Sequence, residues 1–568
     1  MTIPHPGPSD EPAGETAPKL RVIPLGGCGE IGMNMTAIEY DGEILIVDCG
    51  HMQPEDDMPG VDLVIPDTSY LEERREKIHG IVLTHGHEDH IGGLPYIIPK
   101  LQCPVFGTRL TLALAEAKLE EYKLGAVQDL REARCREPLR FGPFTVEWIS
   151  VTHSIPDASA LLIRTPMGII VHSGDYKMDL SPVLGEPFDF HALTTVGEER
   201  ALLLLADSTN VERSGRARSE AAVRPALERY FQEAEGSIIL ATFSSALHRI
   251  QICFDLAEQY GRKVFLSGLN MERNIRIARN LGFLKINEET LAPLKQYPQH
   301  PREKRIVLTT GSQGEPLSGL MRMSLDDHKQ VQVEPGDTVL LSARIIPGNE
   351  RAIGRMINHF FRRGANVVTE RQDAIHASGH ANADEMRMLL SLVRPRFVAP
   401  VHGEVRHQLE HKRLLHDAGV PEENVFILDN GSVLEFGPDQ TARVLEEKIS
   451  ASRVLVDGVM EDVHEVVLRD RMHLAEDGLV LVLLTIDRKT AQLLAEPEII
   501  SRGFVYMEES EELIAELKGV VLEAFNETEK ESREEWLVVR EAVRRAVRRY
   551  TKKQMQRFPI ILPVVTEI

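Results

Sequence analysis

Hydrophobic and polar positions in the first part of the chain alternate, or cluster in short runs, in a way that predicts β-strands. Short apolar runs of this kind are typical of strands that are buried on one or both faces. A hairpin is expected where two runs flank Asp41-Gly42, a dipeptide that favours tight turns. One longer stretch, 111–122, has helical spacing. The predicted strands are 20–25, 35–40, 43–47, 80–83, 144–151, 160–163, 168–171 and 201–206.

From residue 219 the pattern changes to short buried strands that alternate with helices. Such alternation predicts a parallel sheet with helices packed against it. Because residues able to bind metals resume after this segment, we interpret it as a domain inserted into the first one. Its predicted strands are 237–243, 263–267, 305–309, 337–342 and 365–369, and its predicted helices are 220–234, a helix that ends at 260, 271–281 and 350–363.

The end of the chain predicts a small α/β domain. Residues 466–485 are expected to form two strands joined by a turn at 476–478, followed by helices at 509–526 and 533–549 and a strand at 560–565. The whole chain is then divided as follows: a disordered tail at 1–19, the first part of a main domain at 20–218, an inserted domain at 219–372, the second part of the main domain at 373–447, a linker at 448–465 and a C-terminal domain at 466–568.

Composition and charge limit the functions that are open to the chain. It has 568 residues and a formal net charge of −22. This charge argues against polyanion binding by the whole surface but leaves room for a local basic channel. The five cysteines form no CxxC pair, which favours reduced thiols and a cytoplasmic location. Residues 1–19 lack the apolar core of a signal peptide. The longest apolar run, 479–484, is too short to span a membrane.

The residues able to bind metals are most concentrated in the run Thr84-His85-Gly86-His87-Glu88-Asp89-His90, directly after the predicted strand at 80–83. Imidazole nitrogen and carboxylate oxygen together are typical ligands of zinc and similar cations. A strand that runs into a tight loop can point His85 and His87 at one ion, while Asp89 and His90 turn towards a second. A polar surface loop with chance histidines is the alternative.

Further ligand-type residues stand at the ends of other predicted strands. Each is a common turn residue by itself, but their repetition predicts one edge of a sandwich lined with metal ligands. Asp48 is a candidate for orienting the ligands from behind, with a plain turn aspartate as the alternative. These strand-end residues are Asp48, His153, Asp175, Asp207 and His402, and His380 follows the inserted segment.

Three other stretches carry weaker signals. The glycine-rich turn at 26–32 would either cradle a phosphate or let the backbone turn near the metal site. The acidic loop at 54–62, which includes Asp56, would bind a hard cation or simply be solvated. Ser244 and Ser245 follow a strand of the inserted segment, where they would complete a pocket for a terminal phosphate or cap a helix.

Taken together, these motifs resemble those of the β-CASP branch of the metallo-β-lactamase superfamily. The runs HGHEDH, HSGDYK, DSTN, HASGH and PVHGE, with the inserted segment and the length, are similar to the bacterial ribonuclease J family over nearly the whole chain. The resemblance implies an α/β fold made of a metallo-β-lactamase αββα sandwich, an inserted parallel α/β β-CASP domain and a small α/β C-terminal domain.

The resemblance also implies two Zn²⁺ ions per chain, with Mn²⁺ or Mg²⁺ as ions that would also support activity. One carboxylate would bridge both ions, and another would orient the ligands. The implied ligands are His85, His87 and His153 for one ion; Asp89, His90 and His402 for the other; Asp175 as the bridge; and Asp48 behind them.

The chemistry of phosphodiester hydrolysis gives roles to the remaining candidates. His380 is placed to give a proton to the leaving 3′ oxygen, and Asp207 would hold its imidazole in the right tautomer; a structural histidine is the alternative. The HASGH run would bind RNA phosphates, and Ser244 and Ser245 would complete a pocket for a 5′ monophosphate. The residues of that run are His376, Ala377, Ser378, Gly379 and His380.

The function that the resemblance implies is a metal-dependent ribonuclease with 5′→3′ exonuclease and endonuclease activity on single-stranded RNA, acting in RNA maturation, including that of rRNA, and in mRNA decay. Its partners would be RNA with a 5′ monophosphate, further copies of the chain in a homodimer or tetramer, and other RNA-decay proteins, with no membrane. A DNA-processing β-CASP nuclease is the first alternative, but histidine at position 402 resembles the RNA-acting members. A second alternative is a hydrolase of small esters or lactams; the inserted domain argues against it, because a small substrate needs no second domain. A third alternative is a non-catalytic RNA-binding scaffold; the full ligand set argues against it, because such a scaffold would not need these ligands.

Overall fold

The computed structural model describes residues 18–568, except for 56, 126–128, 347, 459, 462, 506–509 and 529–535. Its contacts divide the chain into two compact units. The first is made of Met1–Met52 and Ile65–Arg453, and the second of Gln53–Val64 and Val454–Ile568. Most of the tail expected at 1–19, and Asp56 of the acidic loop, lie outside the described residues.

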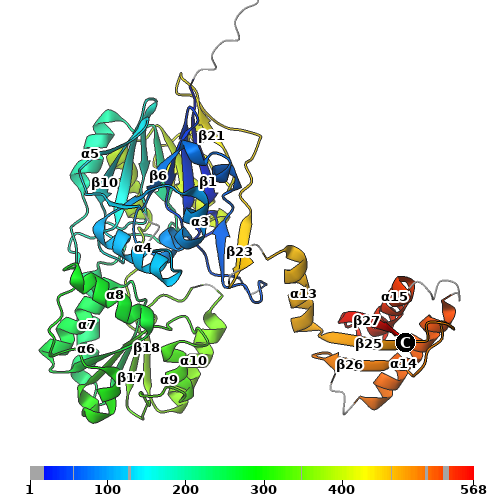
Figure 1. The fold of residues 1–568 in the computed structure, drawn as a ribbon. Helices are drawn as coiled ribbons and strands as arrows, with labels where there is room; N and C mark the ends of the chain where they lie inside the picture. The colour runs from blue at the N-terminus through cyan, green and yellow to red at the C-terminus, as the bar shows by residue number, and fades with distance from the viewer. Residues whose placement is uncertain are drawn as a thin grey trace, which may run out of the picture. The chain divides into compact units, whose positions relative to one another are not determined.

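Two β-sheets form the centre of the first unit (Figure 1). One has the strand order β22-β21-β1-β3-β4-β6-β7-β8, and the other has the order β19-β13-β12-β11-β10-β9. The strands of the first are β22 (Ala442–Val444), β21 (Leu434–Phe436), β1 (Leu20–Gly26), β3 (Met35–Tyr40), β4 (Glu43–Val47), β6 (Ile78–Val82), β7 (Val105–Gly107) and β8 (Leu130–Glu132). The strands of the second are β19 (Phe397–Val401), β13 (Leu203–Asp207), β12 (Gly168–His172), β11 (Ser159–Thr165), β10 (Phe144–Ser150) and β9 (Leu139–Phe141).

Buried apolar side chains fill the space between these two sheets. On β10, Val146 and Trp148 point into that space, whereas Ile149 belongs to the core on the outer face. This division follows from the two-residue period of a strand. Helices α3 (Leu94–Leu101) and α4 (Arg109–Glu121) pack on the outer face of the first sheet, and α5 (Phe190–Glu199), α11 (Ala383–Val393) and α12 (Val405–Asp417) pack on that of the second. The predicted αββα sandwich is therefore confirmed.

A parallel sheet with the order β15-β16-β14-β17-β18 is inserted in the chain between β13 and β19. Both of its faces are covered, as parallel sheets require, with α6, α7 and α8 on one side and α9 and α10 on the other (Figure 1). The predicted α/β insertion is confirmed, although α9 was not predicted. Its strands are β14 (Ile238–Ala241), β15 (Lys263–Ser267), β16 (Arg305–Thr309), β17 (Thr338–Leu341) and β18 (Asn366–Thr369), and its helices are α6 (Arg224–Glu233), α7 (Leu247–Gln259), α8 (Leu269–Asn280), α9 (Gly319–Leu325) and α10 (Glu350–Arg362).

One predicted element of the second unit is wrong. Residues 466–485 do not form two strands, because their first half is helix α13 (Glu465–Glu476) and only β25 (Leu479–Ile486) is a strand. The adjacent valines at 466 and 467 suggested a strand, but Leu468 and Met472 have the four-residue spacing of a helix face. The side chain of His464 also accepts a hydrogen bond from the Val466 backbone N–H and caps the first turn.

The sheet of the second unit has the order β26-β25-β27 and buries one face against α14 and α15. The bounds are β26 (Glu498–Arg502), β27 (Ile560–Glu567), α14 (Glu511–Glu527) and α15 (Trp536–Met555). The other face, which we call the open sheet face, carries apolar side chains that remain partly exposed. Aligned across the three strands, they are Leu479, Leu481, Leu483, Ile500, Ile560, Leu562 and Val564. None of the described helices has the length and apolar character needed to cross a membrane.

Candidate metal centre

The predicted metal-binding run begins where β6 ends and is held in place from behind by Asp48. The Asp48 carboxylate accepts hydrogen bonds from the backbone N–H and the hydroxyl of Thr84, both at 2.8 Å. It also accepts one from Nδ1 of His90 at 2.8 Å, which leaves Nε2 of His90 facing the site. Asp48 has a φ of 59°, in the left-handed region. These contacts fix the orientation of His90.

A first group brings together His85, His87, His153 and Asp175, whose ligand atoms lie within 4.8 Å of one another. Nδ1 of His87 lies 3.0 Å from Nε2 of His85 and 3.1 Å from Nε2 of His153. His153 donates from Nδ1 to the carbonyl of Gly379 at 2.7 Å. Because a carbonyl only accepts, the neutral ring keeps a lone pair on Nε2. Three imidazole nitrogens therefore meet at one point beside a carboxylate.

A second group contains Asp89, His90, Asp175 and His402. Nε2 of His402 lies 3.2 Å from Oδ2 of Asp89, and its Nδ1 lies 3.0 Å from Oδ1 of Asp175. Nε2 of His90 lies 3.3 Å from Oδ2 of Asp175. Asp175 thus belongs to both groups and lies between them.

The glycine-rich turn at 26–32 shapes the backbone that presents His402. The backbone N–H of His402 donates to the carbonyl of Gly27 at 2.7 Å, and Cys28 pairs with Gly403 in a short parallel bridge. His402 has a φ of 51°, so this ligand-type residue sits in a backbone conformation that a histidine adopts only when its surroundings hold it there. These contacts support the second of the two expectations for the turn, that it lets the backbone approach the site.

Burial and neighbouring charges divide the histidines into two kinds. Burial lowers the pKa of His85 and His153 well below the usual value and lowers the pKa of His87 to about 4. Burial acts in the same direction on His90 and His402, but the surrounding carboxylates, with Asp175 contributing most, together outweigh it and raise the pKa of both histidines well above the usual value. The first group therefore offers neutral imidazoles with free lone pairs, and the second is richer in negative charge.

The first group fits a tetrahedral cation such as zinc. Nitrogens bound at about 2.0–2.1 Å lie roughly 3.3 Å apart around such an ion, and the nitrogens here are separated by 3.0 and 3.1 Å. Nδ1 of His87 carries at most one hydrogen, so a hydrogen bond can satisfy only one of its two contacts. A cation satisfies both, because each neutral nitrogen points a lone pair at it.

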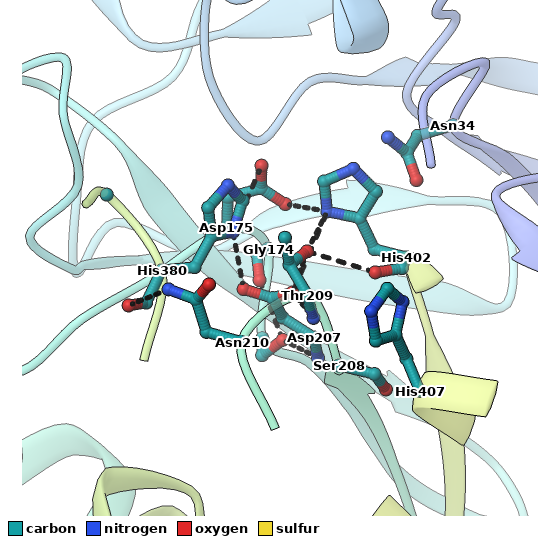
Figure 2. A network of polar contacts seen from close by, with 12 residues as sticks. Asn34, Gly174, Asp175, Asp207, Ser208, Thr209, Asn210, His380, His402 and His407 are labelled. Carbon is teal, nitrogen blue, oxygen red and sulfur yellow. Dashed lines mark hydrogen bonds and ion pairs between the residues drawn. The ribbon is translucent and has the colours of Figure 1, made fainter. Parts of the chain in front are cut away.

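A third group, which shares Asp175 and His402, adds Asp207 and His380 (Figure 2). Nδ1 of His380 donates to Oδ2 of Asp207 at 2.9 Å. The other oxygen of Asp207 accepts from the backbone N–H and the hydroxyl of Thr209, at 2.9 and 2.7 Å. Burial lowers the pKa of His380, but the carboxylates of Asp207 and Asp175 outweigh it and raise the pKa above the usual value. Asp207 therefore orients a histidine whose Nε2 is free to exchange a proton.

The two serines of the inserted domain do not cap the helix that follows them. The N-cap of α7 is Ala246, which makes no side-chain capping bond. The hydroxyl of Ser244 accepts a hydrogen bond from Nδ2 of Asn274 at 3.2 Å, and Ser245 lies next to it, partly buried. The capping alternative is therefore wrong for Ser244 and Ser245.

A buried arginine joins this helix to the HASGH segment. Arg249 of α7 donates to Nδ1 of His376 at 3.1 Å and to the carbonyl of Ala377 at 3.4 Å. The next residue, Ser378, accepts a hydrogen bond at its hydroxyl from Nδ2 of Asn210 at 2.8 Å. The helix behind Ser244 and Ser245 and the segment around Ser378 are thus parts of one connected structure.

Two asparagines contribute to the site although the sequence did not single them out. Nδ2 of Asn34 lies 3.1 Å from Nε2 of His90, and Nδ2 of Asn210 also contacts the carbonyl of His380 at 3.2 Å (Figure 2). Asn210 belongs to the DSTN run, so this motif could have identified it as a residue of the site. Asn34 follows the glycine-rich turn without any pattern that marks it.

Among the described residues, three largely buried groups of imidazoles and carboxylates at one edge of an αββα sandwich, with a parallel α/β insertion, define a metal-dependent hydrolase. The chain matches the family described as "Metallo-beta-lactamase superfamily" over residues 29–202 and "Ribonuclease J, beta-CASP domain" over 235–360. It also matches "Zn-dependent metallo-hydrolase RNA specificity domain" over 364–428 and "Ribonuclease J C-terminal domain" over 466–568.

Curated relatives match over nearly their full length. Ribonuclease J2 of Bacillus subtilis is 37% identical, covering 97% of this chain and 99% of the relative. Ribonuclease J of Thermus thermophilus is 41% identical, covering 99% and 97%, and that of Synechocystis is 41% identical, covering 96% and 86%. The chain belongs to the ribonuclease J family, and it is a metal-dependent ribonuclease.

A solved structure shows the same fold at much lower sequence identity. The crystal structure of a protein of unknown function from Enterococcus faecalis V583 covers 74% of this chain and 100% of its own, with a TM-score of 0.51 and 15% identity. This likeness supports the fold and nothing finer.

Proposed function

We propose that this ribonuclease degrades and matures single-stranded RNA as a 5′→3′ exonuclease and an endonuclease, using two Zn²⁺ ions per chain. The observation that carries the proposal is the position of Asp175, which belongs to all three groups of ligand-type side chains. A phosphate held at the first two groups would therefore have the pair formed by His380 and Asp207 beside it. Cytoplasmic action in mRNA decay and rRNA processing, with other RNA-decay proteins, belongs to the same proposal.

The chain supplies ligands of two kinds in this proposal. One ion is held by the three neutral imidazoles, the other by the group richer in carboxylate, and Asp175 contributes to both. Bound divalent cations would clamp the phosphate and lower the pKa of the attacking water. The ligands proposed are His85, His87 and His153 for the first ion and Asp89, His90 and His402 for the second, with Asp48 orienting His90.

His380 is proposed as the proton donor to the leaving 3′ oxygen. Its Nδ1 is committed to Asp207 at 2.9 Å, so Nε2 is the nitrogen that would give the proton. Asp207 is in turn fixed by Thr209, which prevents the pair from turning away. This arrangement resembles other catalytic histidines, in which a carboxylate selects the tautomer.

The direct test uses purified protein with end-labelled single-stranded RNA, zinc or manganese, and product sizes on a gel. We expect mononucleotides from RNA with a 5′ monophosphate and longer fragments from RNA whose 5′ end is blocked. The same oligonucleotide made of DNA is the matched control. Faster cleavage of the DNA than of the RNA would support the DNA-processing alternative instead.

A 5′ triphosphate is expected to slow exonucleolytic decay at least about tenfold, which corresponds to about 1.4 kcal/mol. The proposed pocket would be formed by Ser378, Gly379 and His380 together with Ser244 and Ser245, and we propose that it accepts one phosphate and not three. The measurement compares the release of mononucleotides from one transcript with either end. Removing the outer two phosphates from the same transcript should restore the rate, whereas equal rates for both ends would contradict the pocket.

A chain that ends near Lys448 is expected to be a monomer that retains its metal and cuts RNA poorly. The open sheet face defined above offers seven aligned apolar side chains for contact with a second copy, and exposed apolar patches of this kind mark interfaces. Light scattering measures the mass, and elemental analysis measures the metal. Leu481→Glu in the full chain is the matched point variant, and a truncated chain that is still a dimer would place the interface elsewhere.

A further inference from the structure

We infer that a hollow lined by arginines, next to the metal centre, binds phosphate groups of the RNA chain as a second anchoring site. The inference rests on the proposed action on single-stranded RNA. The hollow has a volume of about 420 Å³. We call it the arginine hollow, and the residues that define it are Arg213, Arg216, Arg218, Arg371, His376 and Ser378.

The charge of the arginine hollow is not neutralised by the protein. Its four arginines are exposed, and Glu370 is the one carboxylate among its described lining residues. Among the described residues, no ion pair involves these arginines, and the only hydrogen bond made by their side chains is from Arg216 to the carbonyl of Met178 at 3.3 Å. Such a cluster stands out in a chain whose net charge is −22. Guanidinium groups are the preferred partners of phosphate oxygens, because their planar forks can donate two hydrogen bonds.

The part of the arginine hollow that His376 and Ala377 line is held in place by buried charged side chains. Arg249, with 2% of its surface exposed, donates to Nδ1 of His376 and to the carbonyl of Ala377. It also donates to Glu220 at 2.9 Å, and Glu220 accepts from Lys177 at 3.2 Å; both of these residues are buried. Arginine can only donate, so Nδ1 of His376 must be the acceptor and its ring hydrogen is on Nε2. The ring of His376, one of the lining residues, is therefore held in a single tautomer.

The arginine hollow and the metal centre share a wall. Ser378 lines the hollow, and Asn210 donates both to its hydroxyl at 2.8 Å and to the carbonyl of His380 at 3.2 Å. His376 and His380 are four residues apart, a span of at most about 14 Å even in extended chain. RNA held in the hollow would therefore lie within a few nucleotides of the bond that is cut.

The ligand we assign is the RNA backbone rather than the 5′ end alone. Four arginines exceed the need of one terminal monophosphate, and a hollow of about 420 Å³ is larger than one phosphate group. Contacts to backbone phosphates add affinity regardless of sequence and of the chemistry of the 5′ end. The two possibilities make different predictions for RNA that carries a 5′ hydroxyl.

The test measures binding of a single-stranded 2′-O-methyl RNA, which resists cleavage, to the full chain with Arg216→Ser and Arg218→Ser combined. We expect a Kd about 10- to 100-fold weaker than that of the wild-type chain, with either a 5′ phosphate or a 5′ hydroxyl. Each phosphate contact to a single strand contributes about 0.7 to the slope of log Kd against log salt concentration. The slope should therefore fall by about 1.4 in the double variant.

Two controls separate this site from the metal chemistry. Arg134→Ser with Arg140→Ser removes the same charge from exposed positions elsewhere and should leave Kd and slope unchanged. Hydrolysis of bis(p-nitrophenyl) phosphate, too small to reach the arginine hollow, should be equal in all three proteins and shows that the variants are folded.

An unchanged Kd and slope in the Arg216 and Arg218 variant would overturn the inference. A loss confined to RNA with a 5′ phosphate would also overturn it, because the hollow would then serve the terminal phosphate only. Either result leaves the proposed function intact if the wild-type chain still cuts RNA. If the wild-type chain prefers DNA, the proposed function fails by itself.

Discussion

Replacing His87 with alanine is expected to release metal from the chain and to slow RNA hydrolysis at least about 10³-fold. Nδ1 of His87 is the atom that lies within 3.1 Å of the Nε2 atoms of both His85 and His153, so its loss opens the first group on two sides. A catalytic metal contributes several kcal/mol to transition-state stabilisation, and about 4 kcal/mol corresponds to the stated factor. Elemental analysis and single-turnover rates on 5′-monophosphorylated RNA measure the two effects.

The matched control is His191→Ala, which removes an exposed imidazole on α5. It should bind as much metal as the wild-type chain and cut RNA at the same rate. Full metal occupancy in the His87→Ala protein would remove His87 from the ligand set, even if activity were lost.

Replacing His380 with alanine is expected to leave the metal in place and to slow RNA hydrolysis roughly 10²- to 10⁴-fold, the usual scale for a general acid. The reason is geometric: His380 contacts Asp207 at 2.9 Å, whereas its nearest approach to Asp175 is 3.9 Å. The loss should depend on the leaving group. A p-nitrophenolate leaves without a proton, so hydrolysis of bis(p-nitrophenyl) phosphate should fall much less than hydrolysis of RNA.

Asp207→Asn tests the same pair from the other side. Because the two residues act as a unit, the variant that combines Asp207→Asn with His380→Ala should be little slower than His380→Ala alone. If metal content falls together with activity in His380→Ala, the histidine is a ligand and the assignment as proton donor is wrong. Equal losses on RNA and on the nitrophenyl ester would contradict the leaving-group argument.

Local patterns in the sequence were enough to predict most of the longer strands, the insertion and the clustering of His85, His87, Asp89 and His90. These features depend on spacing within a few residues, which a sequence shows directly. The hairpin at Asp41-Gly42 is a clear case: Tyr40 pairs with Glu43, and both turn residues have positive φ. The wrong strand prediction at 466–485 arose because two adjacent valines are compatible with either element.

The supporting contacts were not predictable in the same way. Asn210 reaches the carbonyl of His380, and Arg249 reaches His376, across separations of 170 and 127 residues. No short-range pattern in the sequence indicates a contact between residues that are so far apart in the chain. The backbone of His402, held at a φ of 51° by its bond to Gly27, is equally invisible in the sequence, because it is imposed by packing from the other end of the domain.

The insertion of the parallel sheet between Asp207 and His380 has a consequence for the chain as it leaves the ribosome. The first group of ligand-type side chains is complete once Asp175 has been made, but the second and third groups wait for His402. At about 5–20 residues per second, that wait lasts roughly 10–45 seconds. A half-made chain thus carries three imidazoles and a carboxylate with neither His380 nor His402. The order of synthesis therefore keeps the centre incomplete until residue 402 of the 568 has been made.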